Sequence, residues 1–472
     1  MYEKFGQFIN GKWLNSSGGE TYDVFNPANE ELLGKASKAN KNDIELALQS
    51  AKNGFEIWKN TTPWERSKII RNISEIIKKK KDVLANWLTL EVGKPLKEST
   101  GEVIGAADIF EWSSEEAKRI YGETLQGRQA DTRIHVYYQP VGVVAALVPW
   151  NFPITLASRK ISTALSAGCS VIVKPDVITP GAVMELVNIC NEAGVPPGVV
   201  NLLSGDPPFI SDQLLSSDII KKVSITGSTR VGKLILKKAA EKVQRVTMEL
   251  SGHSPFIVFD DADIDKVTDI AIFAKFRNNG QVCISPSRFY IHESKKNDFT
   301  NLLVKKTKKL KIGNGMDKDV VLGPLTTKKR LNEIEELVEV TKKEGANILC
   351  GGKKPSGFNK GYFYEPTVFD NVQDNFTIMK TEPFGPLIPI LQFKDFDDVV
   401  KRANNNDLGL ASYIYTKDLE KAHRASELME TGTVAVNTGV VALPEAPFGG
   451  IKQTGYGREG GSMAIKDYLN IK

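Results

Sequence analysis

The feature that most constrains the fold is a run of alternating strands and helices between Val141 and Lys242. Stretches such as SVIVKPD and KKVSITGS are apolar or β-branched, as expected for strands covered on both faces of a parallel sheet. Stretches with helical periodicity, such as GAVMELVNICNEAG and STRVGKLILKKAAEK, separate them. This βαβαβ order predicts a doubly wound sheet whose ligand binds at the carboxyl ends of the strands.

A second α/β pattern follows the first. It contains predicted strands in SRFYIHE, ASYIYT and TVAVN, and a predicted helix in TTKKRLNEIEELVEVTKKEG. A chain of 472 residues is too long for one hydrophobic core, so we expect two α/β domains. The stretch PFGGIKQTGYGREGG is predicted to be loop because it is rich in glycine, and the tail AIKDYLNIK is predicted to supply an edge strand.

Composition argues against several classes of partner. Lysine and arginine total 62 against 57 acidic residues, a net charge of +5 that does not indicate nucleic-acid binding. The lysine run from Lys78 to Lys81 continues a helical isoleucine pattern and is predicted to be a solvated face. The four cysteines form no CxxC pair, so we expect no metal site. The chain has no apolar leader and no long apolar run, so we expect a cytoplasmic protein without a membrane span.

Two motifs after predicted strands offer groups for an anionic ligand. In SITGSTRVGK, Gly227 and Ser228 open a helix whose free N–H groups favour anions, and Gly232 lies one turn further on. The motif lacks the middle glycine of GxGxxG, so an ordinary capped helix is the alternative. In VIVKPD, Lys174 leaves a buried strand at the same sheet edge; a lysine that only reaches solvent is the alternative.

Three further residues could perform chemistry. Asn151 in VPWNFP lies on a turn framed by prolines, where its amide could donate to an oxyanion or merely stabilise the turn. Glu249 in TMELSG is the only acid at an otherwise apolar-to-small strand end, where burial would raise its pKa toward that of a general base; a salt-bridging glutamate is the alternative. Cys283 in RNNGQVCISPSR is a nucleophile candidate without a nearby histidine.

Together these motifs resemble the aldehyde dehydrogenase superfamily over essentially the whole chain. VPWNFP, KP, TGSTRVG, MELSG, NNGQVC, EPFGP and PFGGIKQTGYGRE occur in the family's order, and Cys283 follows Glu249 by the family's 34 residues. The resemblance implies two doubly wound α/β domains, one dinucleotide-binding and one catalytic, plus a small β arm for oligomerisation. It assigns residues 1–118 and 140–250 to the first domain, 251–440 to the second, and 119–139 with 441–472 to oligomerisation and bridging.

The resemblance also implies roles for the candidate residues. Cys283 is the nucleophile that forms a thiohemiacetal and then a thioester, Glu249 is the general base, and Asn151 forms the oxyanion hole with the backbone N–H of Cys283. Glu459 in GREGG matches a glutamate to which a proton-relay role is sometimes given. The implied NAD(P) site contains Trp150, Lys174, Val177, Gly227, Ser228, Gly232, Leu250 and Glu382.

Departures from the family's motifs bear on coenzyme and substrate. Val177 stands where members that prefer NAD carry a ribose-binding glutamate, which favours NADP, although the adjacent Asp176 leaves NAD open. Arg159 and Arg277 match the pair that anchors the substrate carboxylate in succinate-semialdehyde dehydrogenases, and arginine suits carboxylates. Arginines paired to local acids are the alternative. The anchor's serine is absent, since Ala442 and Leu443 stand there.

These matches predict NAD(P)-dependent oxidation of a carboxylated semialdehyde by a homodimer or homotetramer, with no metal, nucleic-acid or membrane partner. A broad-specificity aldehyde dehydrogenase is the main alternative. A CoA-acylating relative is disfavoured by the presence of Glu249, and a non-catalytic binding module by the intact Cys283, Glu249 and Asn151. Ser285 occupies the position of a second cysteine found in some relatives, so a redox-switch disulfide is not expected.

Overall fold

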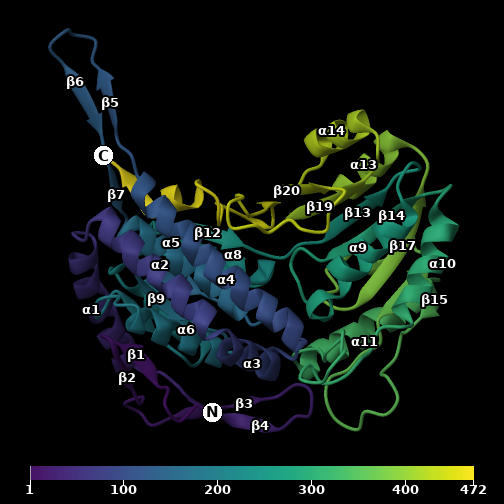
Figure 1. Ribbon diagram of the computed structural model, residues 1–472, viewed down its shortest axis with the longest axis horizontal. Helices are drawn as coiled ribbons and strands as arrows, with labels where there is room; N and C mark the ends of the chain where they lie inside the picture. Colours follow the sequence, from purple (N-terminus) through teal and green to yellow (C-terminus); the bar gives the residue numbers. More distant parts are fainter. Residues whose placement is uncertain (1) are drawn as a thin grey trace.

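The computed structural model describes residues 2–472 and consists of two α/β lobes with a projecting hairpin (Figure 1). The first lobe holds an eight-stranded sheet whose five central strands are parallel. Their bounds, in spatial order, are β10 (Val200–Leu202), β9 (Ser170–Lys174), β8 (Val143–Leu147), β11 (Ile220–Thr226) and β12 (Arg245–Glu249). The antiparallel strands at the edges are β2 (Lys12–Leu14), β1 (Gln7–Ile9) and β22 (Gly455–Tyr456).

Helices cover both faces of this sheet, because neighbouring strand residues point to opposite sides. Val143 and Ala145 of β8 pack with one group of helices, and Val144 and Ala146 pack with the other. The first group is α1 (Lys41–Trp58), α7 (Pro207–Ser216) and α8 (Thr229–Ala240). The second group is α2 (Pro63–Lys79), α3 (Lys81–Val92), α4 (Leu96–Glu116), α5 (Pro153–Ala167) and α6 (Gly181–Glu192). The doubly wound sheet predicted from the strand–helix alternation is therefore present.

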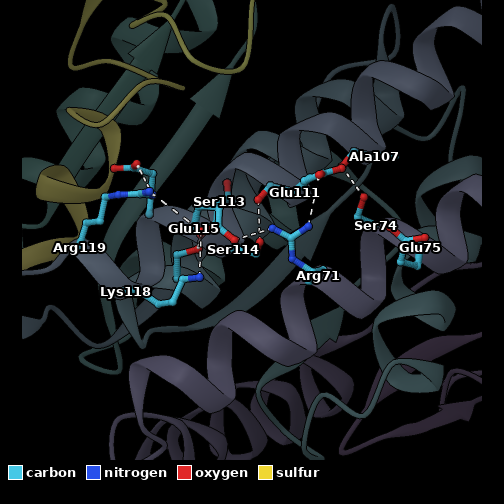
Figure 2. Close-up of polar contacts among 12 residues, drawn as sticks. Arg71, Ser74, Glu75, Ala107, Glu111, Ser113, Ser114, Glu115, Lys118 and Arg119 are labelled. Carbon is cyan, nitrogen blue, oxygen red and sulfur yellow. Dashed lines mark hydrogen bonds and ion pairs between the residues drawn. The ribbon is translucent and has the colours of Figure 1, made fainter.

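Helix α4 was not among the predicted elements, and it forms one wall of the site described below. Polar contacts fix it to α2: the Arg71 guanidinium pairs with Glu111 and Glu115, and Ser74 Oγ donates to the Ala107 carbonyl at 2.8 Å (Figure 2). On the same side of α4, Val103 and Phe110 are buried in the core. The helix is therefore held rigidly from behind.

The second lobe holds a seven-stranded sheet, parallel except for its first strand. In spatial order it contains β15 (Asn347–Cys350), β16 (Thr367–Asp370), β17 (Leu387–Phe393), β14 (Pro286–His292), β13 (Ser254–Val258), β19 (Ala411–Tyr415) and β20 (Thr433–Val436). One face packs against α9 (Ile264–Phe276) and α10 (Lys296–Thr307). The other packs against α11 (Lys328–Lys343), α13 (Phe396–Asn404) and α14 (Leu419–Leu428).

The glycine-rich stretch near the C-terminus was predicted to be loop throughout, and that prediction is wrong in part. Strand β21 (Ile451–Lys452) pairs with β18 (Leu408–Gly409), and β22 pairs with β12 of the first sheet. A Cβ on Gly455 would lie 2.3 Å from the Met248 carbonyl oxygen, and the φ of Gly455 is +112°. Glycine here permits the close backbone approach that strand pairing requires.

The edge strand predicted in the C-terminal tail is confirmed. The tail forms β23 (Leu469–Ile471), which pairs with β7 (Tyr138–Pro140). Strands β5 (Glu123–Gln126) and β6 (Arg133–Val136) form the hairpin that projects from the body in Figure 1, and the C-terminus lies near its base. The N-terminal part contains a further hairpin, β3 (Thr21–Phe25) with β4 (Leu32–Ser37). Within residues 2–472, every helix is too short or too polar to cross a membrane.

Candidate active site

Cys283 lies on a turn with unusual backbone geometry between α9 and β14. Asn278 and Asn279 have left-handed φ angles of 46° and 54°, and Gly280 follows with 75°. A Cβ on Gly280 would lie 2.2 Å from the Gly385 carbonyl oxygen, so only glycine fits against the EPFGP loop. Consecutive left-handed residues that are not glycine persist only where the surroundings hold them, and they cluster at functional sites.

Asn151 follows β8 on a turn that is bonded directly to the Cys283 turn. Its carbonyl oxygen accepts hydrogen bonds from Asn278 Nδ2 at 3.0 Å and from Lys94 Nζ at 2.7 Å. Its amide nitrogen donates to the Gln281 carbonyl oxygen at 3.2 Å, and its second N–H has no partner within residues 2–472. The sequence-predicted asparagine and cysteine are therefore brought together, with one amide N–H available to a ligand.

A buried ion pair stands behind this turn. Lys94 Nζ and Glu102 Oε2 lie 2.7 Å apart, and both side chains are completely buried. Glu102 Oε1 accepts from the backbone N–H groups of Ile154 and Thr155 at the start of α5. Lys94 also lies over the Phe152 ring. The pair thus clamps the turn that carries Asn151. Sequence reasoning missed both residues; the one signal for Glu102 was an acid within the apolar stripe of α4.

Glu249 ends β12 with its carboxyl group buried beside Cys283. Thr226 Oγ1 donates to Glu249 Oε2 at 3.1 Å, whereas Oε1 is buried without a partner in the described chain. Burial raises the pKa of Glu249, and the neighbouring Glu459 raises it further, as expected for a carboxyl group removed from water. Burial and then Glu249 raise the pKa of the Cys283 thiol well above its usual value. In the resting site both groups therefore disfavour their negatively charged forms.

A chain of polar groups leads away from Glu249. Lys160 Nζ donates to Thr226 Oγ1 at 2.7 Å and pairs with Glu459 Oε1 at 2.5 Å. The lysine is fully buried and Glu459 nearly so. Glu459 belongs to the segment that also forms β22, so this segment places it next to the first sheet. Glu249 is thereby linked through a hydroxyl to a buried ion pair.

Cys283, Asn151, Arg159 and Arg277 line one cavity of about 650 Å³. Arg159 is 4% exposed, and its Nη1 is buried without a hydrogen-bond partner in the described chain. Its guanidinium lies over the Phe448 ring at 5.0 Å, and that of Arg277 over the Phe152 ring at 5.1 Å. Neither arginine forms an ion pair within residues 2–472, although burial raises the pKa of nearby Glu98 and the charge of Arg277 opposes that rise. A buried guanidinium without an ionic partner, as at Arg159, beside a thiol and a second arginine suits an anionic substrate group.

The predicted dinucleotide residues lie where parallel strands end in the first sheet. Lys174 ends β9; burial lowers its pKa to about 8, and its Nζ makes no hydrogen bond or ion pair among residues 2–472. Ser228 caps α8, and a Cβ on Gly227 would meet open space. Close packing explains the glycine at position 232, because a Cβ on Gly232 would lie 2.5 Å from the side chain of Leu250. A cation without an ion pair at the end of β9, together with a helix N-terminus beside open space after β11, fits the phosphates and ribose of a dinucleotide.

The remaining cofactor candidates frame the same region. The Trp150 ring meets the Phe384 ring edge-on at 5.5 Å, so the turn after β8 faces the EPFGP loop. Glu382 in that loop accepts from the Gly252 N–H at 3.3 Å, and burial raises its pKa to about 7. Val177 lies apart, at a second cavity of about 570 Å³ that Lys38 also lines. Asp176 accepts from the Ile178 N–H, so part of its capacity is used locally.

Comparisons with known proteins agree with this geometry. The model of the family described as "Aldehyde dehydrogenase family" matches residues 13–472. The chain is 42% identical to the NADP-dependent succinate-semialdehyde dehydrogenase of Escherichia coli K12, covering 98% of this chain and 96% of that relative. It is 41% identical to the glutarate-semialdehyde dehydrogenase of Pseudomonas putida KT2440, with the same coverage. The crystal structure of an NADP-dependent enzyme from E. coli superimposes with a TM-score of 0.98 at 42% identity, covering 100% of this chain and 98% of that one.

Proposed function

The chain belongs to the aldehyde dehydrogenase family, and from this premise we propose that it oxidises a carboxylated semialdehyde to the dicarboxylic acid with NADP or NAD. The observation that carries the substrate assignment is that Arg159 and Arg277 both line the cavity of Cys283, and that Nη1 of Arg159 is buried there without a hydrogen-bond partner in the described chain. The names of the relatives support it, since those enzymes act on succinate and glutarate semialdehydes.

In the proposed mechanism the two arginines hold the carboxylate while Cys283 attacks the aldehyde carbon. The thiol proton passes to Glu249, whose raised pKa makes it a competent acceptor once charge develops on sulfur. The hemithioacetal oxyanion accepts from the free N–H of Asn151 and from the backbone N–H of Cys283. The bound coenzyme supplies the hydride acceptor that converts this adduct to a thioester.

Glu249 acts again in the second half-reaction. It removes a proton from water, which attacks the thioester carbon and forms a second oxyanion in the same hole. Collapse of this oxyanion breaks the carbon–sulfur bond, releases the acid and returns the sulfur of Cys283. The polar chain from Glu249 through Thr226 to Lys160 and Glu459 supports a route for the proton to leave. A water-activating carboxyl group favours hydrolysis over transfer of the acyl group to CoA.

For the coenzyme we propose that NADP is preferred. Val177 offers no carboxylate to accept the ribose 2′-OH or to repel a 2′-phosphate, and Asp176 is engaged with the Ile178 N–H. The name of the E. coli succinate-semialdehyde dehydrogenase supports this choice. The measurement is kcat/KM with each coenzyme at one aldehyde concentration; a hundredfold preference for NAD contradicts the proposal.

The substrate assignment is tested with Arg277→Ala. We expect KM for succinate semialdehyde to rise about a hundredfold, because a charge-assisted carboxylate contact contributes roughly 2–3 kcal/mol when buried. KM for butanal, which has no carboxylate, should change less than about threefold. Equal effects on the two aldehydes refute the anchor and leave a broad-specificity aldehyde dehydrogenase as the function.

We also propose a homodimer or a dimer of dimers in the cytoplasm. The β5–β6 hairpin exposes Leu125, Ile134 and Tyr137 away from the body of the molecule, and exposed strand edges usually acquire a partner. A free nucleophilic thiol is compatible with a reducing compartment. Sedimentation of the wild type and of a chain carrying Ile134→Asp tests the assembly; an unchanged sedimentation coefficient contradicts this use of the hairpin.

A further inference from the structure

One wall of the substrate cavity is a single face of α4. Glu98, Gly101, Gly105 and Asp108 all line the cavity and follow one another at helical spacing, so they form one stripe. Glu98 lies at the inner end, where its carboxylate accepts from the Asn278 N–H at 2.7 Å, next to Arg277. With about 1.5 Å of rise per residue, Asp108 lies about 15 Å further along the helix. The stripe therefore leads from the reacting thiol outward.

The two glycines in this stripe leave space that nothing in the protein fills. Glycine is unfavourable in a helix interior and is usually kept there for close packing. A Cβ on Gly101 or Gly105 would meet no atom within 4 Å, and both side-chain positions face the cavity. By contrast, a Cβ on Gly232 would lie 2.5 Å from the side chain of Leu250. Gly101 and Gly105 thus form a notch in the cavity wall.

The notch makes the cavity large for a four-carbon semialdehyde. Cavities of about 300–1,000 Å³ hold ligands of drug size, and this one has about 650 Å³. Its other walls are largely apolar and include Ile272, Phe273 and Leu443, and Ala442 offers no hydrogen bond. A short acid would leave much of this apolar surface in water. The walls therefore match a substrate with a larger apolar body.

We propose that this enzyme selects acidic semialdehydes longer than four carbons, namely ω-oxo monocarboxylates of about six to eight carbons. This inference rests on the proposed function, because it retains Arg159 and Arg277 as the carboxylate anchor. The methylene chain bows into the notch over Gly101 and Gly105 while its two ends stay at Cys283 and at the arginines. Asp108 has no ion pair within residues 2–472 and disfavours a second carboxylate at the outer end.

The test compares chain lengths within each of three proteins. The wild type, Gly105→Phe and Gly105→Ala are assayed with the four-, six- and eight-carbon ω-oxo acids, and kcat/KM is measured for each. Phenylalanine fills the notch, whereas alanine strengthens the helix and leaves the notch mostly open, so alanine is the matched control. The ratio of the six-carbon to the four-carbon value does not depend on the fraction of enzyme that is folded.

We expect the wild type to favour the six-carbon acid by tenfold or more, Gly105→Phe to lower that ratio at least tenfold, and Gly105→Ala to leave it within threefold. A wild type that favours the four-carbon acid, or a ratio unmoved by Gly105→Phe, overturns the inference. Octanal assayed alongside separates the two proposals. If octanal is oxidised as well as the eight-carbon acid, the carboxylate anchor has failed. If the eight-carbon acid is favoured over octanal but the three acids show no length preference, only the notch has failed.

Discussion

Two sets of charged side chains lie near the Cys283 turn, and they differ in how their charges are compensated. Behind the Asn151 turn, Lys94 is paired with Glu102 and bonded to a carbonyl oxygen. In the cavity, Arg159 is almost as buried but has no ionic partner in the described chain. A buried charge is costly unless it is paired. The paired set therefore belongs to the scaffold, and the unpaired set retains unfavourable free energy that a ligand can relieve.

The largest expected effect comes from the unpaired carboxyl group. Glu249→Gln keeps the shape of the side chain and removes the proton acceptor, so kcat should fall by about 10³-fold, within the range for loss of a general base. Stability to urea should not fall, because no ion pair of Glu249 is broken. Stopped-flow absorbance should still show one burst of reduced coenzyme if acylation remains faster than hydrolysis. A kcat within tenfold of the wild type contradicts the assignment of Glu249 as base.

The paired set should respond in the opposite way. Lys94→Met leaves Glu102 buried and unpaired, so the free energy of unfolding should fall by about 3–5 kcal/mol. The double variant Lys94→Met with Glu102→Gln should recover part of this loss, since no bare charge remains. Urea unfolding followed by tryptophan fluorescence measures both. If the single variant is as stable as the wild type, the ion pair does not clamp the turn.

An unpaired arginine gives a smaller effect on stability and a selective effect on substrate. Arg159→Met removes a buried cation but keeps an aliphatic side chain over Phe448, so the free energy of unfolding should change by less than about 1 kcal/mol or rise slightly. KM for the acidic semialdehyde should rise about tenfold to a hundredfold, because one arm of the anchor is lost. A loss of 3 kcal/mol or more in the free energy of unfolding would show that Arg159 stabilises the fold, and would contradict its assignment to the uncompensated charges.

The sequence predicted which residues form the site, but it did not predict which of their charges are paired. Cys283, Glu249 and Asn151 were predicted because each lies in a short, recognisable motif at the end of a strand or in a turn. Arg159 and Arg277 were predicted from their motif positions, and the structure brings both into the cavity of Cys283. Their lack of ionic partners could not be predicted, because it depends on which distant acids fail to reach them.

What sequence reasoning missed lies mostly on α4 and in long-range contacts. Gly101 and Gly105 weaken the helical signal of that segment, so the element with the largest share of the cavity wall went unpredicted. The Lys94–Glu102 pair connects the segment after α3 to α4 and then to α5. Hydrophobic periodicity along the sequence cannot predict such a contact between helices. The strands in the glycine-rich segment were missed for a related reason: glycine indicates a turn locally, but here it permits close pairing with β12.

The smallest effect concerns Lys174, the unpaired cation of the dinucleotide region. Burial lowers its pKa from 10.5 to about 8 in the folded chain. Below pH 8 the folded protein must keep a buried ammonium group charged, and above about 10.5 the lysine is neutral in both folded and unfolded chains. Stability therefore rises with pH between these limits.

In the absence of coenzyme, Lys174→Met should be more stable than the wild type at pH 7 by about 1 kcal/mol. The gain should shrink as the pH rises from 8 toward 10.5, and urea unfolding at pH 7 and pH 10 measures it. A gain independent of pH, or a loss at pH 7, would show that Lys174 is compensated and belongs with the scaffold charges.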